Sequence, residues 1–229
     1  MGRYRGPKVK IIRRLGFLPG LTKKNTKNRR KTPGQHGKVV FSKSTRLSLT
    51  DDYRERLIEK QKLRFNYGVS EKQLISYYKK AKTNKLATGK VLLELLENRL
   101  DCIVYRLGFA RTIPAARQLV NHGHICVNKK MINIPSFQCQ IKDKISFQGN
   151  EKSKKLILEN FSQNQQNRKL ILRRLKRTRL KNSRFQSLLP PHLEIQTKKQ
   201  FYGQVLSKVA RKDVLVKINE LKIVEYYSR

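Results

Sequence analysis

Residues 93–150 carry the pattern that most restricts what this chain can fold into. Four apolar residues recur at i, i+3, i+4 and i+7, the spacing of one helix face: Leu100, Ile103, Val104 and Leu107. Gly108 follows them and predicts the end of that helix. Thr112 can cap a second helix, Pro114 suits its first turn, and Gly123 can end it. The pattern predicts two short helices joined by a glycine turn.

A small antiparallel sheet is predicted directly after the second helix. Residues 124–133 alternate in polarity and predict a hairpin that turns at Asn128 to Lys130. Residues 144–147 predict a closing strand. The sequence therefore predicts a compact module of two helices and a small sheet over residues 93–150.

The segments on either side of this module predict a discontinuous organisation. Residues 1–50 form a basic N-terminal extension, and residues 151–186 form a basic insertion with 12 Lys or Arg against two acids. Residues 51–92 and 187–229 together form a helical body. We therefore expect an α+β fold in which a mostly helical body is interrupted by the small α+β module.

Local signals refine the predicted body. Ser70 followed by Gln73 predicts a capping box at the start of its second helix. After the insertion, Val214–Ile218 and Ile223–Tyr227 are candidate strands. The first 50 residues hold 15 Lys or Arg and no acid. Because that extension cannot bury enough apolar surface to offset its backbone entropy, we expect it to be mobile until it binds RNA.

The charge of the chain indicates a polyanionic partner. It carries 54 Lys and Arg against 15 Asp and Glu, a formal net charge of +39. So much like charge repels itself, and phosphate relieves this repulsion while counterions are released. Nucleic acid is the default partner. An anionic membrane surface is the weaker alternative. The sequence has neither an apolar run that could span a bilayer nor a signal-peptide pattern.

The cysteines and histidines do not predict a metal centre or a cofactor site. Cys102, Cys126 and Cys139 include no CxxC pair, so we expect reduced, packed thiols. His122, His124 and Cys126 share alternate positions, but they supply only three ligands, and His122 is expected to end a helix. Hydrogen bonding to RNA is the preferred role for the two histidines. The sequence predicts no metal and no cofactor.

The predicted RNA contacts combine basic, amide and aromatic side chains. Arg117 and Asn121 are one helical turn apart and should share an outward face, whereas Gln118 should point elsewhere. Arg99 should be free for phosphate while Asp101 has a structural role. In the module the candidates are Arg99, Arg106, Arg111, Arg117, Gln118, Asn121, His122, His124, Asn128, Lys129 and Lys130. In the extension and body they are Arg3, Tyr4, Arg5, Arg13, Arg14, Gly34, Gln35, His36, Gly37, Lys60, Lys62 and Arg64.

A series of collinear motifs resembles one known family, small-subunit ribosomal protein S4. The matching segments run from the first residue to the last: Met1 to Pro7, Pro33 to Gly37, Glu59 to Phe65, Tyr67-Gly68, Arg99 to Asp101, Tyr105 to Gly108, Ala116 to Ile125, Val127-Asn128, Ile134 to Ser136 and Glu225 to Arg229. Residues 13–22 and 112–114 look most like plastid and cyanobacterial members. The resemblance implies a chloroplast ribosome, with a bacterial cytoplasm as the alternative, and the lack of a transit-peptide pattern would fit synthesis inside the organelle.

The resemblance implies a function in the small ribosomal subunit. Family members bind the 5′ domain of small-subunit ribosomal RNA, nucleate assembly of the subunit body, and contact ribosomal protein S5 near the channel through which messenger RNA enters. The contact with S5 supports translational accuracy, and here it would involve Tyr226 and Tyr227. The chain departs from the family at Lys129 and Lys142, where glycine is common, and in its expanded insertion. It also lacks the N-terminal cysteines that hold zinc in some members.

Three alternatives remain open at this point. An RNA-modifying enzyme could carry such a module, but the remaining residues are few and basic and show no nucleotide-binding loop or nucleophile motif, so no enzymatic activity is expected. A helix-turn-helix regulator would bind duplex DNA sequence-specifically. A basic filler protein would have no RNA site of its own.

Overall fold

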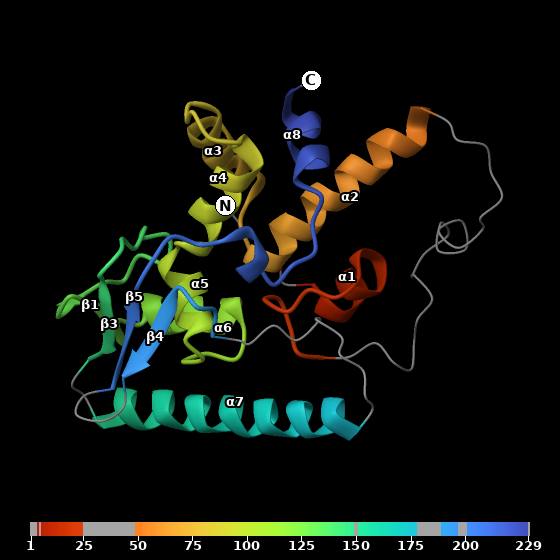
Figure 1. The fold of residues 1–229 in the computed structure, drawn as a ribbon. Coiled ribbons are helices and arrows are strands. Elements are labelled where there is room, and N and C mark those ends of the chain that lie inside the picture. The colour runs from red at the N-terminus through yellow and green to blue at the C-terminus, as the bar shows by residue number, and fades with distance from the viewer. Residues whose placement is uncertain are drawn as a thin grey trace. The chain divides into compact units, whose positions relative to one another are not determined.

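The computed structural model describes residues 4, 6–24, 49–148, 151–177, 189–196 and 201–228. The chain divides into two compact units. Unit 1 consists of Met1–Leu93 with Val216–Arg229, and unit 2 of Glu94–Leu215. Helices predominate and a small antiparallel sheet accompanies them (Figure 1), so the predicted α+β class is confirmed. No helix in the described ranges is both long and apolar enough to cross a membrane.

Unit 1 is built from helices that are distant in sequence. Its described helices are α1 (Lys8–Leu15), α2 (Leu49–Tyr67), α3 (Glu71–Lys82), the first part of α4 (Thr88–Glu97) and α8 (Glu220–Ser228). The predicted capping box begins α3, since Ser70 Oγ accepts from Gln73 N at 3.3 Å and Gln73 Oε1 accepts from Ser70 N at 3.1 Å. The C-terminal helix α8 packs against α2, which brings segments far apart in the sequence into one core.

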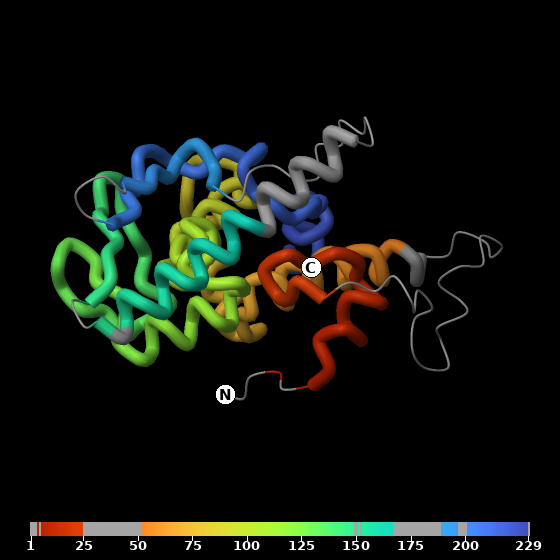
Figure 2. The backbone as a smooth tube through the Cα atoms, turned by 90° about the horizontal axis from the view of Figure 1, so that it is seen from below, coloured from red at the N-terminus to blue at the C-terminus, as the bar shows by residue number. Residues whose placement is uncertain are grey.

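The start of the chain is more ordered than the sequence predicted. Residues 6–24 include helix α1, which lies against α2 (Figure 2). Its packing depends on apolar residues that are 7% exposed or less: Ile11, Ile12, Leu15, Leu18 and Leu21. Gly20 N also donates to Asn66 Oδ1 at 2.9 Å. The expectation of a mobile extension is therefore wrong for residues 6–24, while residues 25–48 lie outside the described ranges.

Unit 2 contains the predicted helix pair and a five-stranded antiparallel sheet. The helices are α5 (Leu100–Arg106) and α6 (Ile113–Asn121). The strands are β1 (Ile125–Val127), β2 (Lys130–Met131), β3 (Lys144–Phe147), β4 (Leu193–Gln196) and β5 (Tyr202–Val205), in the order β2-β1-β3-β5-β4. Cys126 pairs with Met131 on one side and with Ser146 on the other. The hairpin and the closing strand are thus where the alternation predicted them.

The last part of the chain differs from the prediction. Strand β5 pairs with β3, as Ile145 opposite Gly203 shows, so residues 189–215 belong to unit 2 and not to the helical body. Of the two predicted strands, 214–218 forms none and 223–227 lies in α8. The apolar run in α8 is too short to distinguish a strand from a helix by spacing, and its packing on α2 decides for the helix.

A long helix forms the first part of the predicted insertion. Helix α7 (Glu151–Arg177) runs along unit 2 (Figure 1) and contacts β3. Ser153, Ile157 and Asn164 are buried at helical spacing, and Asn164 Nδ2 donates to Gly108 O at 2.7 Å. An aromatic cluster extends this contact, with the ring of Phe201 within 6 Å of three others: Phe109, Phe147 and Phe161. Residues 178–186 of the insertion lie outside the described ranges.

The hairpin turn has an unusual composition for its geometry. Val127 pairs with Lys130, so the turn consists of Asn128 and Lys129, with φ of 50° and 68°. Two left-handed residues in a two-residue hairpin turn indicate the type I′ turn, which usually has glycine at its second position. Asn128 stabilises the turn, because its side chain donates to Asp143 Oδ1 at 2.8 Å and accepts from Lys144 N at 3.0 Å. Lys129 and Lys142 both have positive φ, a backbone conformation that is more strained for lysine than for glycine, so each destabilises its turn.

Candidate nucleic-acid interface

Helix α6 presents a polar face that is fixed by its start and by its buried side. Thr112 Oγ1 accepts from Ala115 N at 3.3 Å, which is the predicted cap. The buried side consists of Ile113, Ala116, Leu119 and Val120. Gln118 and Asn121, three residues apart, are exposed together, and Arg111 and His122 are exposed at the two ends of the helix. Gln118 therefore shares the outward face with Asn121, contrary to the prediction.

Arg117 is turned away from that face. Its guanidinium donates to Asp101 Oδ2 from Nε at 3.0 Å and from Nη2 at 2.5 Å. Asp101 is 1% exposed and also receives Arg99, with Nε at 3.0 Å from Oδ1 and Nη2 at 2.8 Å from Oδ2. The predicted structural role of Asp101 agrees with this arrangement. The expectation that Arg99 is free for phosphate is wrong, because Arg99 is the N-cap residue of α5 and its extended backbone lets the side chain reach Asp101.

Arg106 is the second buried arginine of the module. It is 2% exposed, and its guanidinium binds Glu97 through Nε at 2.9 Å and Nη2 at 2.8 Å. Nη2 also donates to Asp213 O at 2.8 Å. Arg106 is therefore a core residue of unit 2, and its prediction as an RNA contact is corrected. The bidentate geometry explains why a buried arginine is tolerated here.

The hairpin supplies the other exposed residues of the module. Asn128, Lys129 and Lys130 are all exposed. The end of α6 lies beside β2, since a side chain at Gly123 would meet Met131 Sδ at 3.1 Å. The hairpin strand β2 is therefore a direct neighbour of the end of α6.

The two histidines have separate roles in the structure. His124 is half-buried, and its Nδ1 lies 2.8 Å from Ser153 Oγ of α7, so this side chain helps to hold α7 against the module. His122 is exposed, and its ring centroid lies 6.0 Å from that of His124. Cys126 is buried in β1. Among the described residues no group of three potential ligands could hold a metal ion.

Several candidates of unit 1 are engaged within the protein. Lys60 is 5% exposed and donates to Glu71 Oε1 at 3.1 Å and to Tyr226 Oη at 3.3 Å, which corrects its prediction as an RNA contact. Lys62 binds Glu59 at 2.6 Å. The half-buried Arg64 lies 3.4 Å from Gln61 Oε1 and 4.0 Å from Glu71. These three basic residues neutralise carboxylates of α2 and α3.

The predicted RNA contacts near the start of the chain differ in their exposure. Tyr4 is 48% exposed and packs edge-on against Phe65, with ring centroids 5.6 Å apart. Arg14 is exposed on α1, and Arg13 is half-buried. The remaining candidates lie outside the described residues: Arg3, Arg5, Gly34, Gln35, His36 and Gly37.

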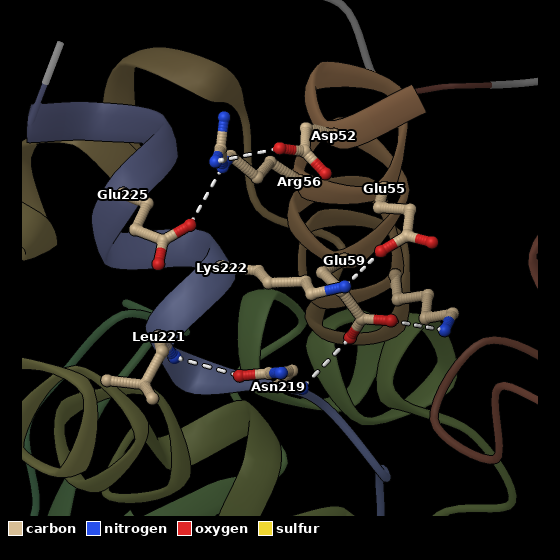
Figure 3. A network of polar contacts seen from close by, with 9 residues as sticks. Asp52, Glu55, Arg56, Glu59, Asn219, Leu221, Lys222 and Glu225 are labelled. Carbon is tan, nitrogen blue, oxygen red and sulfur yellow. Dashed lines mark hydrogen bonds and ion pairs between the residues drawn. The ribbon is translucent and has the colours of Figure 1, made fainter. Parts of the chain in front are cut away.

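A polar network joins α8 to α2 in unit 1 (Figure 3). Arg56 Nε donates to Glu225 Oε2 at 2.7 Å, and Lys222 is paired with Glu55. Glu59 Oε2 accepts from Asn219 N at 3.0 Å, which fixes the start of α8. This side of unit 1 therefore pairs its acids with its bases.

The two predicted partner tyrosines belong to the same contact. Tyr227 Oη donates to Glu71 Oε1 at 2.7 Å, and burial, followed by this hydrogen bond, raises the pKa of Tyr227. Tyr226 stacks at a tilt on Tyr53, with ring centroids 5.9 Å apart. Both Tyr226 and Tyr227 are only partly exposed, whereas Tyr53 is 52% exposed and Leu221 is 72% exposed. The apolar surface left outside the network is therefore supplied by Tyr53 and Leu221.

The three cysteines are packed thiols, as their spacing suggested. All are buried and free. Burial is the largest cause that raises the pKa of each thiol, to about 12 for Cys139. The thiolate that reacts with labels is therefore scarce at neutral pH.

Some residues that shape the interface could not be found from the sequence. Glu97 holds Arg106, and Asn164 fastens α7 to the turn after α5. Asn164 lies within a Gln/Asn run, where no spacing or charge signal sets it apart. Glu97 ends an apolar helix and looks like an ordinary surface acid in the sequence.

Comparisons with known proteins cover the whole chain. A family model described as the ribosomal protein S4/S9 N-terminal domain matches residues 3–97, and one described as the S4 domain matches residues 98–145. The small ribosomal subunit protein uS4c of Rhodomonas salina is 52% identical over 100% of the chain and 99% of that protein. The uS4c protein of Oltmannsiellopsis viridis is 48% identical over the full length of both. The uS4 protein of Prochlorococcus marinus strain MIT 9312 is 47% identical over 100% of the chain and 99% of its own length.

Proposed function

Because the chain belongs to the small-subunit ribosomal protein S4 family, we propose that it binds small-subunit ribosomal RNA directly through one exposed face of unit 2. The protein is a structural constituent of the small ribosomal subunit. We define the module face as the exposed polar residues that connect the start of α6 to the hairpin: Arg111, Gln118, Asn121, His122, Asn128, Lys129 and Lys130.

One observation carries this proposal. No acidic residue occurs between Asp101 and Asp143, and the carboxylates at both limits are engaged, Asp101 by two arginines and Asp143 by Asn128. The module face is therefore positive or neutral throughout. Lysine, arginine and amide groups on such a surface suit the phosphates and 2′-hydroxyls of folded RNA, which is recognised mostly by its shape.

The target within the ribosome follows from the family. We propose the 5′ domain of the small-subunit RNA, bound early enough to nucleate assembly of the subunit body. The same position would place the protein near the channel through which messenger RNA enters. A DNA-binding role is less favoured, because the relatives that match the full length of the chain are named small ribosomal subunit proteins.

Filter binding tests this function. The purified protein should bind the 5′-domain RNA more tightly than an unrelated structured RNA or duplex DNA, and the preference should persist at physiological salt. The affinity should fall with salt by about 0.7–0.9 logarithmic units for each phosphate contact and each tenfold increase in salt. Equal binding to all three nucleic acids that disappears with salt would reject a specific ribosomal RNA site.

We also propose that the outer surface of α2 and α8 contacts ribosomal protein S5. The charges of this surface are paired with one another, so the binding of a phosphate group there would add little binding energy. Its exposed apolar residues are Tyr53 and Leu221. Aromatic and apolar side chains rimmed by satisfied polar groups are typical of protein contacts. Tyr226 and Tyr227 support the contact from within by fastening α8 to Lys60 and Glu71.

The double variant Tyr53→Ala/Leu221→Ala should weaken binding of purified S5 by about tenfold or more, because aromatic anchors often carry over 1 kcal/mol each. Leu86→Ala, a 52% exposed apolar residue elsewhere in unit 1, is the matched control and should bind like the wild type. Isothermal titration of S5 onto the protein bound to its RNA measures both. Unchanged affinity in the double variant would place S5 elsewhere.

The relatives named uS4c support a chloroplast ribosome as the location, and the cyanobacterial relatives support a bacterial cytoplasm as the alternative. Mass spectrometry of ribosomes purified from isolated plastids should detect peptides of this chain. Their presence only in ribosomes from outside the organelle would overturn the chloroplast assignment.

A further inference from the structure

We propose that helix α3 carries a second phosphate-binding surface for ribosomal RNA, made of residues other than the module face. This proposal rests on the proposed function and names a further part of the same binding. We define the α3 lysine face as four lysines of α3 and one in the following turn: Lys72, Lys79, Lys80, Lys82 and Lys85. All five are exposed, and none of them was singled out by the sequence motifs.

The arrangement of α3 gathers these lysines on one side. The buried residues of the helix are Leu74, Tyr78 and Ala81, with Leu74 and Ala81 fully buried. At 100° per residue, they occupy a narrow stripe. Lys72, Lys79 and Lys80 lie on the opposite side around Ser76, which is also exposed, and Lys82 lies at the edge of that side. The outer side of α3 is therefore a continuous cationic surface.

The lysine face lacks internal counterions. No acid occurs from residue 72 to residue 90. The neighbouring Glu71 is engaged by Lys60 and by Tyr227. Among the described residues, the five lysines form no ion pair, whereas Arg56, Lys62 and Lys222 on the α2–α8 side each bind a carboxylate. The two sides of unit 1 therefore differ: the α2–α8 side pairs its charges within the protein, and the lysines of the α3 side have no carboxylate partner among the described residues and can bind an external anion.

The helix dipole accounts for only part of this distribution. The dipole favours cations only in the last turn, which covers Lys79, Lys80 and Lys82. Lys72 lies in the first turn, at the positive end, where a cation is disfavoured. The lysines also repel one another at helical spacing. A surface that is unfavourable in the free protein becomes favourable once phosphate binds, because each contact releases counterions.

RNA fits this surface better than a membrane or an acidic peptide. An amphipathic helix that binds a membrane inserts an apolar face beside its charges, but Leu86 is the one exposed large apolar residue among residues 72–90. Lysine ammonium groups act as adaptable point charges on phosphate oxygens. The α3 lysine face should therefore contact the RNA backbone and add affinity without reading sequence.

The triple variant Lys79→Gln/Lys80→Gln/Lys82→Gln tests the proposal in full-length protein. Glutamine preserves helix propensity. Its affinity for the 5′-domain RNA should fall, and the slope of log affinity against log salt should become shallower by about 2–3, close to one unit for each contact. The triple variant Lys208→Gln/Lys212→Gln/Lys217→Gln removes the same charge from other exposed positions and should change the slope less. Equal changes in both variants would show that only net charge matters and would overturn the α3 site.

A second experiment places the surface independently of affinity. Because the native cysteines are buried, a cysteine introduced at the exposed Ser76 can be labelled selectively with an iron chelate that cleaves nearby RNA. The Ser76→Cys protein should cleave the bound 5′-domain RNA at defined nucleotides, and Leu221→Cys, on the internally paired side, should cleave much less. RNA that binds but is not cut from Ser76→Cys would reject the α3 site while leaving the proposed function intact. Wild-type protein that does not prefer this RNA would reject the proposed function itself.

Discussion

Replacing Arg106 by Met should lower the free energy of unfolding by about 3–5 kcal/mol. Arg106 and Glu97 are both 2% exposed, and two hydrogen bonds join their charged groups. Methionine would leave the Glu97 carboxylate buried without its partner and would also leave Asp213 O without this donor. Urea-induced unfolding followed by circular dichroism gives the free energy. Arg111→Met, which removes an exposed arginine from the same unit, should stay within about 0.5 kcal/mol of the wild type.

The double variant Glu97→Leu/Arg106→Met separates the destabilisation caused by the unpaired Glu97 carboxylate from the loss of the other interactions of Arg106. Removing both charges eliminates the uncompensated carboxylate, so the double variant should be clearly more stable than Arg106→Met. If Arg106→Met unfolds like the wild type, the buried pair described here does not form in solution.

Charge reversal at Arg117 should mainly affect folding, whereas reversal at Arg111 should mainly affect RNA binding. Arg117→Glu would place a second carboxylate beside Asp101, which is 1% exposed and already depends on two arginines. We expect a loss of about 3 kcal/mol or more. Arg111→Glu leaves no buried group unpaired, and it should reduce RNA affinity by roughly tenfold at 0.1 M salt.

Thermal unfolding and filter binding distinguish these outcomes. From the sequence, both Arg111 and Arg117 are predicted RNA contacts. In the structure the Arg117 guanidinium is instead part of the link between α5 and α6. An Arg117→Glu protein that melts at the wild-type temperature would show that this link is dispensable.

Local signals predicted the helix caps and the hairpin well. Thr112 and Ser70 cap α6 and α3 as their spacing indicated, because a cap depends on residues three positions apart. The hairpin was predicted from alternation, and it turns at Asn128 and Lys129. These features are set by neighbours in the sequence, which a single sequence displays.

Long-range pairing accounts for what the sequence did not show. Arg99 and Arg106 look like ordinary RNA-binding arginines, and only the fold reveals the carboxylates that hold them. The run in α8 has strand-like composition, yet its contact with α2 makes it helical. In the same way, the many charges of α1 concealed the apolar residues that pack it against α2.

Unit 2 is one continuous stretch of sequence, whereas unit 1 needs both ends of the chain. The contact between Arg56 and Glu225 spans 169 residues. During translation, α8 leaves the exit tunnel after all of unit 2, so unit 2 can fold before α2 can pack against α8. The order of synthesis therefore gives the newly made protein a formed RNA-binding module before its body is closed.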